Sequence, residues 1–417
     1  MLDIKYIREH ALEIKENCTK RRNKVDIDRL LVVDENRREL LGEVEALRAS
    51  RKSGSKGKPT PEEIAKMRTL GDAIKIKEDA LSIVEAEYLD LMMQVPNLTH
   101  PDSPVGGEED FTVLFQKDQP AFAFVPKDHE EILTKLDLID FERGAKVAAA
   151  KFYFAKNDLV RLNQALLNYG IDVVTKHGYT LMETPDLART SILQGVGFNP
   201  RGNETQIYSI EDTDLSLIGT AEITMGGYHA DEILDLSNGP KKYVAMSHCF
   251  RTEAGAYGRT SKGLYRVHQF TKLEMFVYCQ PSESEKIHQE LRAIEQEICD
   301  GLGLSYRVID IPSGDLGGPA YRKYDLEAFM TMKGEGDKQG DFGEITSTSN
   351  CTDYQARRLN IRYRNAAGET EFVHTLNGTA VVLSRFPIAL IEQNQQADGS
   401  IKVPAVLQPY LGKTIIK

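Results

Sequence analysis

The chain has 417 residues, which is longer than one usual domain, and its formal net charge is −11. This acidic balance excludes a general affinity for nucleic acid, so any RNA-binding site must be local. The first ten residues, MLDIKYIREH, are charged from the third onward. No run of about 18 apolar residues occurs anywhere, so we expect neither a signal peptide nor a membrane span.

The cysteines are few and scattered. They form no CxxC pair and no metal-binding spacing with histidine, and there are five of them: Cys18, Cys249, Cys279, Cys299 and Cys351. An odd, scattered set of this kind is typical of reduced thiols. We therefore expect a cytoplasmic protein without a disulfide framework.

Two heptad patterns occupy the first hundred residues. The first is made by Leu30, Val33, Leu40, Val44 and Leu47, and the second by Met67, Leu70, Ile74, Leu81, Val84, Tyr88, Leu91 and Val95. Arg37 interrupts the first pattern and Lys77 the second. Residues 51–59 provide a flexible turn, and Thr60 with Pro61 is typical of a helix start. Because each helix has one narrow apolar seam, we expect an antiparallel coiled coil.

The region between Lys20 and Thr60 is basic, with 12 Lys and Arg residues against 7 Asp and Glu residues. A basic arm could bind an RNA phosphate backbone, although a solvated helical face would need similar charges. Residues 96–110, PNLTHPDSPVGGEED, break the helix with three prolines and a glycine pair. We therefore expect an arm at 1–108 and a second domain at 109–417.

The second domain has a mixed α/β pattern. Helical periodicity is expected at 159–176 and 282–302, and strands are expected near 179–188, 306–311 and 340–350. In the last part, residues 375–395, small residues precede an apolar helix that carries a single basic residue, Arg385.

A charged hairpin is the most informative part of this domain. We predict strands at Tyr243–Phe250 and Leu264–Tyr278, joined by a loop that contains Gly255, Gly258 and Gly263. Alternation in the second strand places five side chains on one face: Arg266, His268, Phe270, Lys272 and Glu274. Arg251 and Glu253 are expected to share a face of the first strand. A buried face of this kind requires a ligand or mutual ion pairs, so we interpret it as a site for an anion and an ammonium group; a solvated face is the alternative.

The sequence lacks the usual glycine-rich phosphate motifs. Neither GxxxxGK[ST] nor a GxGxxG after a strand occurs, which argues against a P-loop and a dinucleotide fold. Arginine side chains must therefore bind any phosphate. The candidates are Arg251, Arg266 and Arg385, because each lies in an otherwise apolar segment.

Several motifs together resemble one family. FRTEAG, HQFTKLE, the TAE turn, EITSTSNCTDYQARR and NGTAVVLSRFPIALIEQNQ resemble seryl-tRNA synthetases, which are class II aminoacyl-tRNA synthetases. LDIKYIRE and KVDIDRLL also resemble the amino-terminal arm of that family, so the resemblance covers nearly the whole chain. It implies an α+β fold, with a class II antiparallel sheet flanked by helices and an N-terminal antiparallel coiled-coil arm. It also implies a homodimer with Pro185 in its interface.

The resemblance further implies an ATP site. Arg251 would bind both the α-phosphate and the serine carboxylate, and Arg266 would bind the γ-phosphate. Phe270 and Arg385 would enclose the adenine ring between them. Glu253 would contact the adenine amino group and Val267 would line the same nucleotide. The implied ATP-binding positions are Arg251, Thr252, Glu253, Arg266, Val267, Phe270, Glu344, Ile345, Thr346, Ser347 and Arg385.

The same resemblance implies a pocket for L-serine, in which acids bind the ammonium group and polar groups bind the hydroxyl. Its positions are Thr220, Ala221, Glu222, Arg251, Glu274 and Thr379. Glu344 and Ser347 would hold Mg²⁺ through hard oxygen ligands. The implied catalytic residues are Arg251, Glu274 and Arg385, whereas we expect His268 to be structural.

The implied reaction is the formation of seryl-adenylate and transfer of the seryl group to the 3′ end of tRNA(Ser). The arm would bind this tRNA by shape and backbone. The sequence leaves open whether tRNA(Sec) is charged as well. A carrier-protein amino-acid ligase would lack the arm, and an inactive RNA-binding or dimeric relative would be expected to lose Arg251, Glu274, Glu344 or Arg385.

Two features depart from the family pattern. Phe329 occupies a position where the family usually has Trp. Residues 333–343 are longer and richer in glycine than expected, so the sequence does not define the geometry of this loop.

Overall fold

The computed structural model describes residues 1–53, 60–198, 206–254, 262–336 and 338–417. Gly255, Gly258, part of the predicted turn at 51–59 and residue 337 of the 333–343 loop lie outside the described residues. The chain divides into two compact units, Met1–Leu98 and Thr99–Lys417. The division lies about ten residues before the boundary expected at residue 108, and residues between the two positions form hydrogen bonds with the second unit. The amide of His100 donates to the carbonyl of Tyr321, and the amide of Ser313 donates to the carbonyl of Pro104.

Among the described residues of the first unit, helices are the only regular secondary structure. Its helices are α1 (Ile4–Glu9), α2 (Ala11–Lys20), α3 (Ile27–Ser53) and α4 (Pro61–Gln94). The start of α4 is a capping box at the residues expected from the sequence. The hydroxyl of Thr60 accepts from the amide of Glu63, and the carboxylate of Glu63 accepts from the amide of Thr60.

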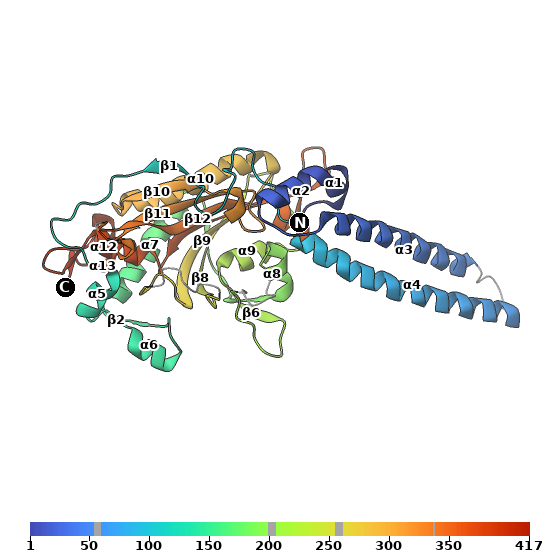
Figure 1. Ribbon diagram of the computed structural model, residues 1–417, viewed down its shortest axis with the longest axis horizontal. Coiled ribbons are helices and arrows are strands. Elements are labelled where there is room, and N and C mark those ends of the chain that lie inside the picture. Colours follow the sequence, from blue (N-terminus) through green and yellow to red (C-terminus); the bar gives the residue numbers. More distant parts are fainter. Residues whose placement is uncertain (54–59, 199–205, 255–261, 337) are drawn as a thin grey trace. The chain divides into compact units, whose positions relative to one another are not determined.

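Helices α3 and α4 lie side by side along their length (Figure 1). The predicted seam is buried at Leu30, Val33, Val44, Ile74 and Leu81. Ion pairs across the two helices show an antiparallel arrangement, because residues early in α3 pair with residues late in α4: Arg29 with Glu87 at 2.7 Å and Glu43 with Lys77 at 2.7 Å.

Arg37, which interrupts the apolar seam, has partners on the opposite helix. Its guanidinium lies 4.8 Å from the ring centroid of Tyr88 and 3.5 Å from the carboxylate of Glu85. The aliphatic stem and the planar cation of an arginine can therefore occupy a seam position without leaving an unpaired charge.

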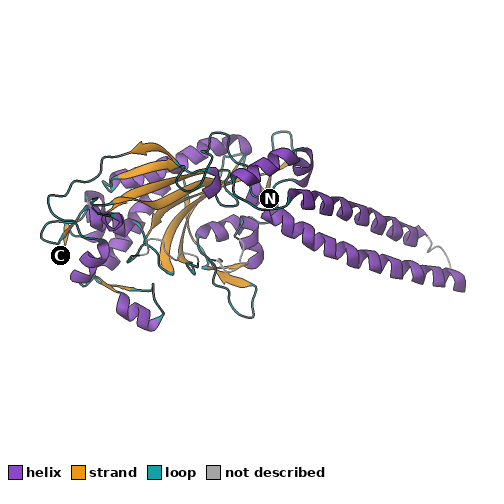
Figure 2. Ribbon diagram, in the orientation of Figure 1, coloured by secondary structure: helices purple, strands orange, loops and turns teal. Residues whose placement is uncertain are grey.

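The second unit is built on an eight-stranded sheet, which Figure 2 shows in orange. All pairs in this sheet are antiparallel except β4 with β8. In spatial order its strands are β1 (Thr112–Gln116), β10 (Tyr306–Asp310), β11 (Arg322–Met330), β12 (Asp341–Asn350), β15 (His374–Val382), β9 (Gln269–Cys279), β8 (Lys241–Phe250) and β4 (Thr180–Glu183). The class II antiparallel sheet expected from the sequence is confirmed.

Helices cover both faces of this sheet, and the alternation of β9 shows how. Leu273, Met275 and Val277 belong to a core with α7 (Asp158–Lys176), α10 (Ser284–Gly301) and α12 (Phe386–Gln393). Phe276 and Tyr278 belong to a second core with α8 (Thr190–Val196), α9 (Ala221–Gly227) and α11 (Tyr354–Leu359). Because successive side chains of a strand point to opposite faces, the two cores lie on opposite sides of the sheet.

Shorter elements complete the second unit: α5 (His129–Lys135), β2 (Ile139–Asp140), α6 (Phe141–Val147), β3 (Phe154–Ala155), β5 (Leu187–Arg189), β6 (Leu215–Leu217), β7 (Ile233–Leu234), β13 (Arg362–Arg364), β14 (Thr370–Phe372), β16 (Ile401–Lys402), α13 (Gln408–Leu411) and β17 (Ile415–Ile416). Three-residue 3₁₀ turns lie at Pro281–Glu283, Ser313–Asp315, Thr331–Lys333 and Ala405–Leu407.

All five cysteines are buried and free, as expected for reduced thiols. Among the described helices, none combines the length and the apolar character needed to span a bilayer.

Phe329, which replaces the expected Trp, is buried in β11. Its ring meets Phe342 of β12 edge to face at 6.1 Å, and a Cβ on Gly340 would overlap the same ring. The aromatic side chain therefore packs against the segment that enters β12.

Candidate active site

One pocket collects most of the residues expected to bind ATP. It is lined by Arg251, Glu253, Tyr265, Val267, Phe270, Lys272, Glu344, Ile345, Thr346, Thr379, Val382, Ser384 and Arg385. These residues come from β9, β12 and β15, from the segments next to β8 and β9, and from the start of α12. The sheet thus brings together residues that are far apart in the sequence.

The predicted hairpin is correct in its pairing but wrong in the extent of its strands. β8 ends at Phe250 and β9 begins only at Gln269, so Arg266 and His268 are not part of a strand. Glu253 has a φ of 51°, a left-handed backbone conformation that breaks the expected alternation with Arg251. Glu253 instead faces Arg266, whose Nη1 lies 3.3 Å from its carboxylate.

Arg251 is held by its backbone and by its side chain. Its amide donates to the carbonyl of His268 at 3.0 Å, and Nδ1 of His268 donates back to the carbonyl of Arg251 at 2.9 Å. The Nε of Arg251 donates to the carbonyl of Gly219, which precedes the TAE turn, at 3.2 Å. The guanidinium lies 5.2 Å from the ring centroid of Phe270. These contacts are consistent with a structural role for His268.

Arg385 precedes α12 and contacts two other segments of the site. Its guanidinium lies 3.9 Å from the ring centroid of Tyr265, and its Nε donates to the carbonyl of Tyr265 at 3.0 Å. Its Nη1 donates to the carbonyl of Glu344 at 2.6 Å. Arg385 thus lies on Tyr265, a residue without a role in the sequence-based prediction, and Phe270 lies beneath Arg251.

Buried polar groups line the side of the pocket formed by β9 and β15. The hydroxyl of Thr379 donates to the carboxylate of Glu274 at 3.2 Å, and Nζ of Lys272 lies 2.5 Å from the same oxygen. Lys272 and Glu274 are two residues apart on β9, so they share a face. The alternation placed Lys272 on this face, but sequence reasoning assigned it no function.

A second acid, Glu222, lies close to Glu274 at the start of α9. Burial, and then the charge of Glu274, raise the pKa of Glu222 from 4.5 to about 7. Its Oε1 accepts from Nε2 of Gln355 at 2.8 Å, and Gln355 also accepts from Thr375. The amide Gln355 is a further site residue that sequence reasoning missed, because its partner lies 133 positions away in the chain.

The other residues of the predicted serine pocket belong to the same turn as Glu222. The hydroxyl of Thr220 caps α9 by accepting from the amide of Glu222 at 3.2 Å, and Ala221 is fully buried. Thr252, at the other side of the site, donates its amide to the carbonyl of Gln206 at 3.1 Å. The lining of the pocket does not include seven of the predicted site residues: Thr220, Ala221, Glu222, Thr252, Arg266, Glu274 and Ser347.

The predicted Mg²⁺ ligands, Glu344 and Ser347, lie on β12, which pairs with β11. Desolvation would raise the pKa of Glu344, but the positive charges of Arg385, Lys323 and Arg251 lower it overall. Ser347 is paired in register with Asp325, whose pKa burial raises to about 7 and whose Oδ1 is buried without a hydrogen-bond partner among the described residues. No group of three or more His, Cys, Asp or Glu side chains suitable for a metal ion occurs in the described ranges.

Comparisons with known proteins agree with this geometry. Residues 1–99 match the seryl-tRNA synthetase N-terminal domain, and residues 207–394 match the tRNA synthetase class II core domain (G, H, P, S and T). The serine–tRNA ligase of Treponema denticola is 50% identical over 99% of both chains, and that of Dictyoglomus thermophilum is 50% identical over 100% of this chain and 99% of the other. The chain belongs to the seryl-tRNA synthetase family.

Solved structures of this family match over the whole chain. The seryl-tRNA synthetase of Pyrococcus horikoshii complexed with ATP superposes with a TM-score of 0.89 at 37% identity, covering 100% of this chain and 99% of the other. The cytoplasmic enzyme of Naegleria fowleri in complex with AMP gives a TM-score of 0.85 at 33% identity, with the same coverage. Both the seryl-tRNA synthetase family and its class II fold, which the sequence motifs had indicated, are confirmed.

Proposed function

We propose that this seryl-tRNA synthetase activates L-serine with ATP and transfers the seryl group to tRNA(Ser). The observation that carries the proposal is the convergence of Arg251 and Arg385 with the Lys272–Glu274–Thr379 cluster around one pocket. An anion site therefore lies beside a site for an ammonium group and a hydroxyl. The relatives named serine–tRNA ligase and the ATP and AMP complexes of two similar structures support this assignment.

In the first step, the serine carboxylate attacks the α-phosphorus of ATP. A new P–O bond forms while the bond to the bridging oxygen breaks, and pyrophosphate leaves with the electron pair. Arg251 would lie between the two anions, where a planar cation reduces their repulsion and stabilises the charge that develops in the transition state. In the second step, a hydroxyl of the 3′-terminal adenosine attacks the seryl carbonyl and AMP leaves. Neither step needs a covalent enzyme intermediate, since positioning and electrostatics are sufficient.

The other polar residues would orient the two substrates. Glu222 and Glu274 would bind the serine ammonium, and Thr379 and Thr220 would bind polar groups of serine. A pocket of this kind rejects alanine, because the buried groups that bind the hydroxyl would be left unpaired. Arg266 would bind the γ-phosphate, Glu253 and Val267 would contact the adenosine, and Phe270 and Arg385 would stack on the adenine. Thr252, Ile345 and Thr346 would also contact the nucleotide.

Glu344 and Ser347 are the residues that would hold Mg²⁺. The donor set fits a hard cation, because the pKa of Glu344 is lowered and the adjacent Asp325 has a buried oxygen without a partner among the described residues. When bound, Mg²⁺ neutralises negative charge on the phosphates.

The N-terminal unit would bind tRNA(Ser) through the basic region between Lys20 and Thr60, whether or not tRNA(Sec) is also a substrate. We further place the enzyme in the cytoplasm as a homodimer. Five free, buried cysteines are consistent with a reducing compartment. Leu181 on the edge strand β4 is 48% exposed and lies near Pro185, at the place where the family resemblance implies the dimer interface.

The test is serine-dependent exchange of pyrophosphate into ATP, followed by charging of tRNA(Ser). We expect exchange with L-serine, exchange with alanine or glycine that is lower by about 100-fold or more, and charging of tRNA(Ser) with serine. Exchange without charging would favour a carrier-protein ligase, and the absence of both would favour an inactive relative. Size-exclusion chromatography with light scattering checks the dimer.

A further inference from the structure

A buried histidine outside the pocket contacts the segment that leads into it. His129, the first residue of α5, is fully buried, and its Nε2 accepts from the amide of Leu264 at 3.0 Å. Leu264 lies just before Tyr265 and Arg266, in the stretch that the sequence predicted to be a strand. Since β9 begins only at Gln269, this stretch lacks the ladder of hydrogen bonds that would otherwise fix its backbone.

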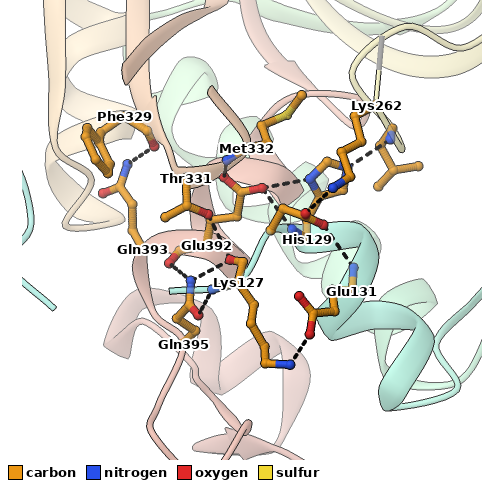
Figure 3. Close-up of polar contacts among 12 residues, drawn as sticks. Lys127, His129, Glu131, Lys262, Phe329, Thr331, Met332, Glu392, Gln393 and Gln395 are labelled. Atoms are coloured by element: carbon orange, nitrogen blue, oxygen red, sulfur yellow. Dashed lines mark hydrogen bonds and ion pairs between the residues drawn. The ribbon is translucent and has the colours of Figure 1, made fainter. Parts of the chain in front are cut away.

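Glu392 of α12 holds the other side of the histidine ring, as Figure 3 shows. Its Oε1 lies 2.8 Å from both the amide and Nδ1 of His129, and its Oε2 accepts from the amide of Met332 at 3.2 Å. Both side chains are fully buried. The bonding defines the tautomer: Nε2 must be an acceptor for Leu264, so the proton is on Nδ1 and points to Glu392.

The chain before His129 is attached to the same end of α12. Nε2 of Gln395 donates to the carbonyl of Lys127 and Oε1 of Gln395 accepts from its amide, both at 2.8 Å. The hydroxyl of Thr331 also donates to the carbonyl of Lys127, at 2.8 Å. The backbone just before His129 is therefore fixed by side chains from the end of α12 and from the neighbouring turn (Figure 3).

A second side chain at α12 contacts the segment that contains Leu264 and Tyr265. Arg385, just before α12, donates to the carbonyl of Tyr265 and stacks on its ring, whereas Glu392 reaches Leu264 through His129. Neighbouring residues are thus held by two side chains from opposite ends of one helix. A shift of Leu264 would move Tyr265, and with it the support on which the guanidinium of Arg385 rests.

We propose that His129 and Glu392 are positioning residues for ATP binding: they fix Leu264, and so set Tyr265, Arg266 and Arg385 in the geometry that receives the nucleotide. This inference rests on the ATP-binding roles proposed above for Arg266 and Arg385. It assigns a function to two buried residues that touch neither substrate.

Two substitutions separate the two hydrogen bonds of the ring. In His129→Asn the side-chain amide can replace Nδ1 and donate to Glu392, but nothing accepts from Leu264. In His129→Gln the side-chain oxygen reaches the position of Nε2 and can accept from Leu264. A buried amide without a partner is costly, so we expect about a tenfold rise in the KM for ATP in His129→Asn. His129→Gln should restore most of this loss, and the KM for serine should stay within about twofold of the wild type in both variants.

Gly263 offers an independent route to the same contact. Its φ is 55°, and a Cβ at this position would overlap Nε2 of His129. Gly263→Ala should therefore raise the KM for ATP as His129→Asn does, while the pair of His129 with Glu392 is kept. Gly303 has a φ of 68° and open space around it, so Gly303→Ala is the matched control for backbone strain alone and should leave the KM for ATP unchanged.

The experiment is pyrophosphate exchange on the full-length enzyme with ATP and serine varied separately, together with thermal unfolding of each variant. Equal KM values for ATP in His129→Asn and His129→Gln would overturn the proposal, as would parallel increases in both KM values that follow the loss of Tm. Arg385→Ala distinguishes the positioning role of His129 from the ATP-binding role of Arg385. If it raises the KM for ATP while His129→Asn and Gly263→Ala do not, the positioning role is wrong and the ATP site stands; if Arg385→Ala has no effect, both are wrong.

Discussion

Lys272 and Glu274 form a buried ion pair, with 2.5 Å between Nζ and Oε2, on the face of β9 that borders the pocket. Their side chains are only 8% and 2% exposed. Glu222, whose pKa is raised in part by Glu274, lies next to this pair. The lysine therefore places a positive charge against one of two neighbouring carboxylates, at the place where we propose that the serine ammonium binds.

Replacing this lysine should impair serine binding. In Lys272→Met the carboxylate of Glu274 would remain buried without its cation. Breaking a buried ion pair in this way lowers the free energy of unfolding by about 3 kcal/mol. We expect the KM for serine to rise by about tenfold or more and the KM for ATP to change by less than about threefold, measured by pyrophosphate exchange.

The matched control is Lys242→Met. Lys242 forms an ion pair with Glu290 at the same distance of 2.5 Å, on the neighbouring strand β8 and away from the pocket. Lys242→Met should leave the KM for serine and the KM for ATP unchanged. A serine KM in Lys272→Met equal to that of the control would contradict the role given to Lys272.

Glu222 predicts a pH dependence of serine binding. Its pKa is raised to about 7, so the carboxylate that we propose binds the serine ammonium forms mainly above that pH. We expect the KM for serine to fall as the pH rises from about 6 to about 8. Glu222→Gln should show a high KM that changes little over the same range, whereas Glu211→Gln, which alters an exposed acid, should retain the wild-type profile.

The same shift predicts the direction of a stability change. Because the pKa of Glu222 is higher in the folded state than its ordinary value of 4.5, the folded protein binds more protons between these values. The free energy of unfolding should therefore decrease as the pH rises from 4.5 through about 7. Glu222→Gln should lack this part of the decrease, so its Tm relative to the wild type should be higher at about pH 8 than at about pH 5. A constant difference in Tm would refute the assignment.

Arg251 should matter for the chemical step more than for binding. In the proposed mechanism its guanidinium stabilises the charge that develops when the carboxylate meets the α-phosphate, so Arg251→Ala should lower kcat for exchange by about 10²- to 10³-fold. Arg251→Lys should recover little, because a lysine cannot make two parallel hydrogen bonds. Arg189→Ala removes an exposed arginine and should leave kcat unchanged. An undiminished rate in Arg251→Ala would be incompatible with the mechanism.

Local patterns predicted those parts of the fold that depend on neighbours in the sequence. The apolar seam of α3 and α4 follows from heptads, and the capping box at Thr60 from its own residues. Alternation also identified the charged face of β9. It failed at Leu264–His268, because an alternating pattern continues past the point where a chain leaves the sheet, and at Glu253, whose left-handed backbone no side-chain pattern reveals.

The supporting residues of the site escaped prediction for a different reason. Gln355 meets Glu222 across 133 positions, and His129 meets Leu264 across 135. Such pairs exist only after the chain has folded, and Gln355 and His129 taken alone look like ordinary buried polar residues. The residues expected to touch substrates lie within recognisable motifs, whereas the residues that orient them are found from contacts.

The basic arm predicts a separation of the two half-reactions. Exposed basic residues on the helical unit, Lys24, Arg51 and Arg68, can approach a phosphate backbone. Their combined replacement by alanine should leave serine-dependent exchange unchanged, because the pocket lies wholly in the second unit. The KM for tRNA(Ser) in charging should rise, and the salt dependence of tRNA binding should weaken by about one unit of logarithmic slope for each phosphate that these side chains no longer neutralise.

Glu45→Ala, which removes an exposed acid from α3, is the control on the same unit, and it should not weaken tRNA binding. Equal loss of exchange and charging in the triple variant would mean that the substitutions disturb the fold. Unchanged charging and an unchanged salt slope would mean that these basic side chains serve solubility alone, which is the alternative that the composition of the arm left open.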